Sequence, residues 1–153
     1  MTVASRLVEL DIILPEGVTP LALYRPAVRS GDLVYVSGQL AIREGQTLHP
    51  GRLGAEVSVE QGQEAARIAA INALAVANDL LPTLDGIRVV RLVGYVACTP
   101  EFHDQPGVIN GASELLRDVL GEQAGVGARL ALGVTALPAS SPVEIELTIE
   151  PGA

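Results

Sequence analysis

The C-terminal part of the chain alternates between apolar and polar positions. Residues 143–150 read VEIELTIE, so valine, isoleucine and leucine fall on one face of an extended segment while three glutamates and a threonine fall on the other. This period of two predicts a strand with one buried face. Residues 128–136 form a second extended segment, and we expect the two to pair as a hairpin around a turn near residues 139–140.

Other segments follow the helical period. Residues 58–81 open with a capping box, Ser58 followed three positions later by Gln61, and an alanine-rich face runs along the segment. Residues 106–120 carry apolar side chains near helical spacing, with a proline in the first turn and a glycine directly after the last. A weaker apolar stripe predicts a short helix at residues 3–11.

The remaining segments complete an α+β pattern. Residues 24–40 predict a hairpin around the turn RSGD, and residues 41–57, rich in glycine and proline, predict a loop with at most one short strand. Residues 87–98 have high β-propensity and apolar groups on both faces, which is typical of a strand covered on both sides. The expected faces are Ile87, Val89, Val93 and Tyr95 on one side and Val90, Leu92 and Val96 on the other.

The predicted order, β-β-(β)-α-β-α-β-β, gives a two-layer sandwich of a mixed or antiparallel sheet with two main helices on one face. We expect a single domain, residues 1–153, in which residues 1–20 form an N-terminal extension. Helices on one face leave the other face of the sheet bare. In a chain this short, another copy of the chain is the simplest cover.

Composition excludes several kinds of protein. The net charge is -8, all ten basic residues are arginine, and aromatic residues make up 3% of the chain, so we expect no nucleic-acid partner. The absence of lysine excludes a lysine Schiff base. Cys98 is the single cysteine, and neither a basic-then-apolar leader nor an apolar run of about 20 residues is present, so we expect a cytoplasmic protein without membrane contact.

Arg129 is the main candidate for a binding residue, because it lies at the start of a predicted strand of small residues. Ala131 shares its face of the strand, which leaves room beside the guanidinium for a carboxylate bound through two parallel hydrogen bonds. An ion pair with one of the glutamates of residues 143–150 is the alternative, and the sequence alone favours it. In the expected hairpin, Glu144 would lie roughly 20 Å from Arg129, so a site containing both would span two subunits. We interpret Cys98, His49 and His103 as packing or surface residues.

The ordered set YRPAVRSGDLVYVSGQL, NGASELL, ARLALGVTALP and VEIEL resembles the RidA/YjgF family, also called L-PSP endoribonuclease-like, and is closest to a divergent branch with an N-terminal extension. The resemblance covers about residues 24–150. It implies a chorismate-mutase-like fold, a homotrimer, and cofactor-free and metal-free hydrolysis of 2-imino acids such as 2-aminoacrylate, as in 2-iminobutanoate/2-iminopropanoate deaminases.

The resemblance also implies roles for individual residues. Arg129 would clamp the substrate carboxylate and Glu144 would orient the attacking water. Tyr24, Gly38, Asn110 and Ala131 would complete the substrate-binding set. Ala131 stands where better-known members have a cysteine, so its backbone N–H remains but no thiol is present. A non-catalytic regulator that binds a 2-keto acid or an amino acid is the first alternative function, and an endoribonuclease is the second.

Overall fold

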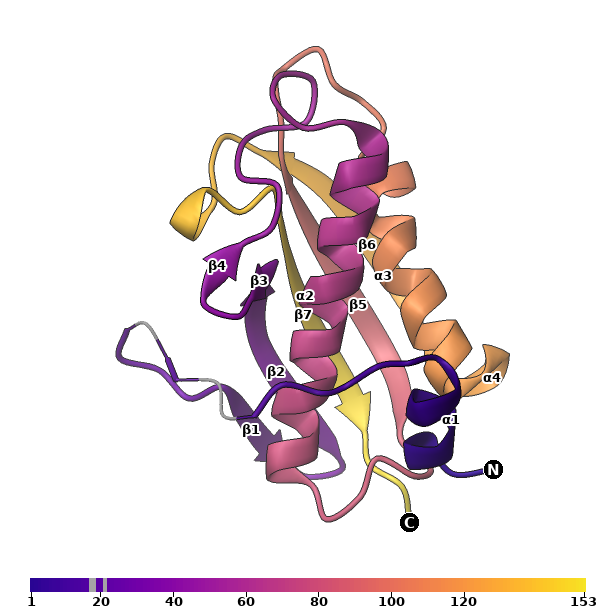
Figure 1. Cartoon of the computed structure of the whole chain (residues 1–153). Coiled ribbons are helices and arrows are strands. Elements are labelled where there is room, and N and C mark those ends of the chain that lie inside the picture. Colours follow the sequence, from indigo (N-terminus) through magenta and orange to yellow (C-terminus); the bar gives the residue numbers. More distant parts are fainter. Residues whose placement is uncertain (17–18, 21) are drawn as a thin grey trace.

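The computed structural model describes residues 1–16, 19–20 and 22–153 as helices packed on a sheet (Figure 1). The helices are α1 (Val3–Glu9), α2 (Val59–Leu80), α3 (Gln105–Leu120) and α4 (Glu122–Gly125), with a short 3-10 turn at Pro138–Ser140. The strands are β1 (Ala27–Ser30), β2 (Leu33–Leu40), β3 (Ile42–Arg43), β4 (Gln46–Thr47), β5 (Arg88–Ala97), β6 (Ala128–Val134) and β7 (Val143–Glu150). The predicted α+β class and order of main elements are confirmed.

Five strands form one mixed sheet in the order β1-β2-β7-β5-β6. The predicted hairpin of β1 and β2 is present, but the predicted hairpin of β6 and β7 is wrong. β7 lies between β2 and β5 and is antiparallel to both, whereas β6 runs parallel to β5 at the edge of the sheet. The four apolar residues of β7 on the helix side are almost completely buried under the helices, and pairing on both sides makes β7 the central strand.

β5 also differs from the predicted pattern. The register between β5 and β7 shifts between Val89 and Arg91, which is the signature of a β-bulge. Because of this extra residue, Val89 and Leu92 both lie on the helix side, while Val93 and Tyr95 face the other way. The strict alternation expected along residues 87–98 therefore fails at the bulge and holds beyond it.

Both long helices cover the same face of the sheet, with α2 and α3 side by side in Figure 1. The capping box of α2 is present, since the Ser58 hydroxyl accepts from the Gln61 amide at 3.1 Å. The buried face of α2 consists mainly of alanine, which lets the helix axis approach the sheet closely. α3 packs equally tightly, because the backbone of Gln63 in α2 lies directly against Gly111.

The opposite face of the sheet carries no helix in the described part of the chain (Figure 1). Several of its large apolar side chains are exposed: Val28 and Tyr35 at one edge and Leu130 at the other. Glu144, Glu146 and Tyr95 lie between these edges. This surface is the bare face that the sequence predicted.

The predicted loop at residues 41–57 contains a small separate hairpin, β3 with β4, in place of at most one strand. The predicted helix at residues 3–11 is present as α1. α4 was not predicted, and it extends the turn that follows Gly121. Within the described ranges, no helix has the length and apolarity needed to cross a bilayer.

Candidate functional site

Arg129 lies on edge strand β6, and its side chain reaches over the helix-covered face to α3. Its Nη1 donates to Asn110 Oδ1 at 2.8 Å and to Ser113 Oγ at 3.2 Å, while Nη2 donates to the Pro106 carbonyl at 3.4 Å. A guanidinium has five N–H donors, so these bonds leave part of the fork available. The arginine is exposed. The structure therefore holds it in one orientation at the surface.

The alternative of an ion pair between Arg129 and a glutamate of β7 is wrong for the described residues. Glu150 binds a different arginine, with 2.7 Å between its Oε2 and Arg88 Nη2. Arg129 meets neutral oxygen atoms, which orient the guanidinium without cancelling its charge. Ala131 is the next residue on its face of β6 and lies opposite Gly94. The sequence correctly indicated small neighbours.

Glu144 belongs to central strand β7 and points toward the bare face, opposite Tyr95 of β5. Its carboxylate lies against Gly38, where an added methyl group would overlap it. Burial, and secondarily the charge of Glu146, raises the pKa of Glu144 above its usual range. The pKa of Tyr95 is raised by burial first and then by the two carboxylates.

A cavity of about 910 Å³ opens beside Glu144. Tyr24 and Gly38 line it together with Glu144, so the structure brings together three of the predicted site residues. Tyr24 is partly exposed, at 45%. The cavity also contains polar residues that sequence reasoning did not include: Ser37, Gln39, Asn72 and Glu146. Alternation along β7 placed Glu146 beside Glu144, but only the fold brings Gln39 and Asn72 to them.

The predicted site thus divides into two halves within one protomer. Arg129 pairs with Leu92 and Glu144 pairs with Tyr95, three residues further along β5. Three residues along the strands and two strand spacings across them separate the Cα atoms by roughly 14 Å. The side chains also lie on opposite faces of the sheet. The hairpin that gave the longer separation is wrong, but a substrate bound by both residues would still need two subunits.

Ser113 is a residue of the arginine half that the sequence analysis missed. It follows Asn110 by three positions on α3, so both side chains lie on one face of the helix and meet the same guanidinium nitrogen. The helical period of residues 106–120 was enough to place Asn110 and Ser113 on one face of a helix. Their contact with the Arg129 guanidinium could not be predicted, because it depends on the position of β6 in the sheet.

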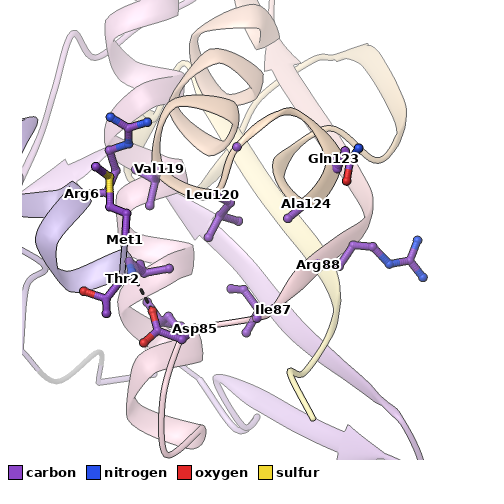
Figure 2. Close-up of a pocket in the computed structure, with 14 residues that line it drawn as sticks. Met1, Thr2, Arg6, Asp85, Ile87, Arg88, Val119, Leu120, Gln123 and Ala124 are labelled. Carbon is purple, nitrogen blue, oxygen red and sulfur yellow. Dashed lines mark hydrogen bonds between the residues drawn. The ribbon is translucent and has the colours of Figure 1, made fainter.

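A second cavity, of about 650 Å³, lies where α1 meets the start of β5 and the end of α3 (Figure 2). The backbone N–H of Val3 donates to Asp85 Oδ1 at 2.7 Å, which ties α1 to the turn before β5. Arg6 and Arg88 border this cavity, and each is paired, with Glu9 and Glu150 respectively. The hydrogen bond from Val3 to Asp85 therefore holds α1 beside this cavity.

The surroundings of Cys98 and His49 agree with their interpretation as packing or surface residues. Cys98 is buried and accepts a weak hydrogen bond from Gln105 Nε2 at 3.6 Å. His49 Nε2 lies 2.8 Å from Glu64 Oε2. Within the ranges that the structure covers, no group of three or more histidine, cysteine or acidic side chains is arranged to hold a metal ion.

A family model described as "YjgF/chorismate mutase-like, putative endoribonuclease" matches residues 4–150. The chain belongs to this YjgF family. The matched residues include most of α1, so the similarity extends through the N-terminal segment.

Individual proteins are also similar to this chain over nearly its whole length. Protein TCP17 of Trypanosoma cruzi is 40% identical over 149 residues, which are 97% of this chain and 93% of that protein. A crystal structure of an Agrobacterium tumefaciens protein of unknown function is 44% identical, with a TM-score of 0.89 over 97% of this chain and 92% of that one. A Shewanella oneidensis protein, named "putative endoribonuclease", is 32% identical with a TM-score of 0.93, over 98% and 99% of the two chains.

Proposed function

We propose that the protein hydrolyses 2-imino acids to 2-keto acids and ammonia, in clefts formed between the subunits of a homotrimer. The main support for the proposal is that Arg129 and Glu144, the two principal site residues, lie on opposite faces of the sheet within one protomer. Arg129 is held in a defined orientation on edge strand β6 with no carboxylate partner among the described residues, while Glu144 lines a cavity on the other face of the sheet. Each protomer offers one half of a site that a second copy can complete.

The chemistry requires little beyond position. The Arg129 fork of one copy binds the substrate carboxylate. Glu144 of another copy accepts a proton from a water molecule, whose oxygen adds to the imine carbon as the π electrons move to nitrogen, and the protonated Glu144 then gives that proton to the nitrogen. In the resulting carbinolamine, Glu144 transfers the hydroxyl proton to the amino nitrogen, so that the C–N bond breaks, ammonia leaves and the C=O bond forms. A raised pKa for Glu144 brings this base closer to the working pH.

The bare face and the exposed edge support assembly of several copies. Among the strands of the described residues, β6 pairs on one side only, and such edges favour pairing with another chain. Val28, Tyr35 and Leu130 are each more than two-fifths exposed on the same face of the sheet. Burying these side chains against another copy would remove apolar area from water. Three copies are the number that the family resemblance implies.

An assay with 2-aminoacrylate, generated in place by a serine dehydratase, tests the proposal through the rate of ammonia release. Arg129→Ala should reduce kcat/KM by about 100-fold, because it removes a charge-assisted contact that positions the substrate. Arg117→Ala is the matched control, since it removes an exposed arginine that pairs with Asp118 at 3.0 Å and lies outside both halves. Equal rates for the wild type and Arg129→Ala would refute the assignment.

The family description gives reason to test ribonuclease activity as a second function. A net charge of -8 and a cavity lined by glutamates oppose binding of a phosphate backbone. RNA cleavage that survives purification and is lost in Arg129→Ala would favour this function over the deaminase. Stabilisation by 2-keto acids without any turnover would instead favour a non-catalytic regulator.

A further inference from the structure

The guanidinium of Arg129 is hydrogen-bonded to three oxygen atoms of helix α3. Nη1 donates to Asn110 Oδ1 and Ser113 Oγ, and Nη2 donates to the Pro106 carbonyl. The three acceptors are spaced by four and then three positions along α3, so they form one stripe on the surface of the helix. We call these three oxygen atoms the arginine cradle.

The cradle determines which part of the guanidinium remains free. An arginine side chain has five N–H groups, two on each Nη and one on Nε. The bonds to Asn110 and Ser113 use both N–H groups of Nη1, and the bond to Pro106 uses one of those on Nη2. The N–H group of Nε and the second one of Nη2 donate to no described residue. These two nitrogen atoms form the side-on edge of the planar group, which can bind both oxygen atoms of a carboxylate through parallel bonds.

The surroundings of Arg129 leave this edge accessible and charged. The arginine is exposed, and Ala131, the next residue on its face of β6, is small. Among the described residues, no carboxylate forms an ion pair with Arg129. The cradle acceptors are neutral, so they fix the guanidinium in place without cancelling the charge that a substrate carboxylate needs.

The hydrogen bonding of Ser113 indicates a role toward Arg129. A serine inside a helix commonly donates to the carbonyl four residues earlier in the same helix. The half-buried Ser113 makes no such bond to a described residue, and its hydroxyl oxygen accepts from Nη1 of Arg129 at 3.2 Å. Its hydroxyl is therefore directed to the arginine rather than to the backbone of α3.

We infer that Ser113 is a positioning residue for the proposed reaction, because it helps to occupy Nη1 and thereby presents the side-on edge of Arg129 to the substrate carboxylate. This inference rests on the proposed function. A carboxylate bound through two parallel bonds lies in the plane of the guanidinium, which fixes the direction of the bond to its imine carbon.

Loss of the Ser113 hydroxyl would free one N–H group of Nη1. The end-on edge, formed by Nη1 and Nη2, could then compete with the side-on edge for the substrate carboxylate. The imine carbon would be held less precisely against the water that Glu144 activates, and the rate would fall.

Free guanidinium ions test the cradle directly, because Arg129→Ala leaves its three acceptors without their donor. Guanidinium chloride at millimolar concentration should bind there and restore part of the 2-aminoacrylate hydrolysis that Arg129→Ala loses. Urea at the same concentration is the control for shape, since it is planar but uncharged. Sodium chloride is the control for ionic strength, and the rate of the dehydratase that supplies the substrate is checked at each concentration.

Adding Ser113→Ala to Arg129→Ala should raise the guanidinium concentration for half-maximal recovery by about tenfold, because one hydrogen bond to a charged donor is lost. Adding Ser113→Thr, which keeps the hydroxyl, should leave that concentration nearly unchanged. Ser30→Ala is the matched control, since it removes an exposed serine of β1, at the opposite edge of the sheet from β6. Alanine favours a helix more than serine does, so Ser113→Ala should fold normally.

Equal half-maximal concentrations with and without the Ser113 hydroxyl would overturn the inference. Absence of any recovery of Arg129→Ala by guanidinium, or equal recovery by urea, would also overturn it. In each of these cases, hydrolysis of 2-aminoacrylate by the wild type would leave the deaminase proposal standing. Failure of the wild type to accelerate that hydrolysis would overturn both.

Discussion

Mixing two inactive variants can reveal whether Arg129 and Glu144 act in one site from different subunits. Arg129→Ala removes the carboxylate clamp, and Glu144→Gln removes the base while keeping the shape of its side chain. Within a protomer, the two residues lie on opposite faces of the sheet with β5 between their strands, at a Cα separation of roughly 14 Å. A small imino acid cannot contact both at that separation.

The expected recovery follows from the symmetry of the assembly. In a ring of three copies, each site takes its arginine from one copy and its glutamate from the next. Any mixed trimer contains one junction at which an intact arginine meets an intact glutamate, whichever variant is present twice. About one third of the sites should therefore be active in mixed trimers, compared with about one half in a two-fold dimer that shares its sites.

The assay uses co-expression of the two variants with different affinity tags and purification over both resins, so that only mixed assemblies remain. Their rate on 2-aminoacrylate is compared with that of wild type carrying the same tags, and with each variant alone. Mixed trimers of Arg129→Ala with Arg129→Lys are a control for the effect of co-expression itself. Mixed assemblies no more active than the single variants would refute a shared site, even if each variant were inactive alone.

Two further predictions concern the energetics of the fold. Burial and the charge of Glu146 raise the pKa of Glu144, so the folded state holds this proton more tightly than the unfolded state and loses stability as the pH rises through the raised pKa. Glu144→Gln should therefore raise Tm at about pH 7 but change it little below about pH 4; thermal melts with an equal shift at both pH values would contradict this. Gly111→Ala would force a methyl group onto the backbone of Gln63 and should destabilise the fold by about 2 kcal/mol in urea unfolding. Gly62→Ala, whose methyl group meets only side chains, should cost less, and the reverse order would contradict the close packing of α2 on α3.

Local features of the fold could be predicted from the sequence because their causes lie within a few residues. The capping box at Ser58 and Gln61 and the turn between β1 and β2 are both read from short segments. Strand pairing depends on residues far apart in the chain. Residues 128–136 and 143–150 are close in sequence, which suggested a hairpin, but β7 pairs with β2 and β5, which lie far from it in the chain.

The candidate site likewise contains residues that could be identified from the sequence and residues that could be identified only from the fold. Arg129 and Glu144 were identified from sequence because unusual residue types stand out in simple strands. Gln39 and Asn72 are ordinary amides in sequence, and they become informative only when β2 and α2 bring them to the wall of one cavity. The same holds for Ser113, whose function as a partner of Arg129 depends on where β6 runs.

The positions of the two principal residues suit their separate tasks. An edge strand is the part of a sheet that can approach another subunit, so an arginine on β6 can reach a cleft that its own chain does not form. A central strand is the part most shielded from water, and shielding is the main cause of the raised pKa of Glu144. Exchanging the positions would bury the cation and expose the base, which would weaken both functions. The topology that separates them in one protomer therefore also gives each residue the environment that the proposed reaction needs.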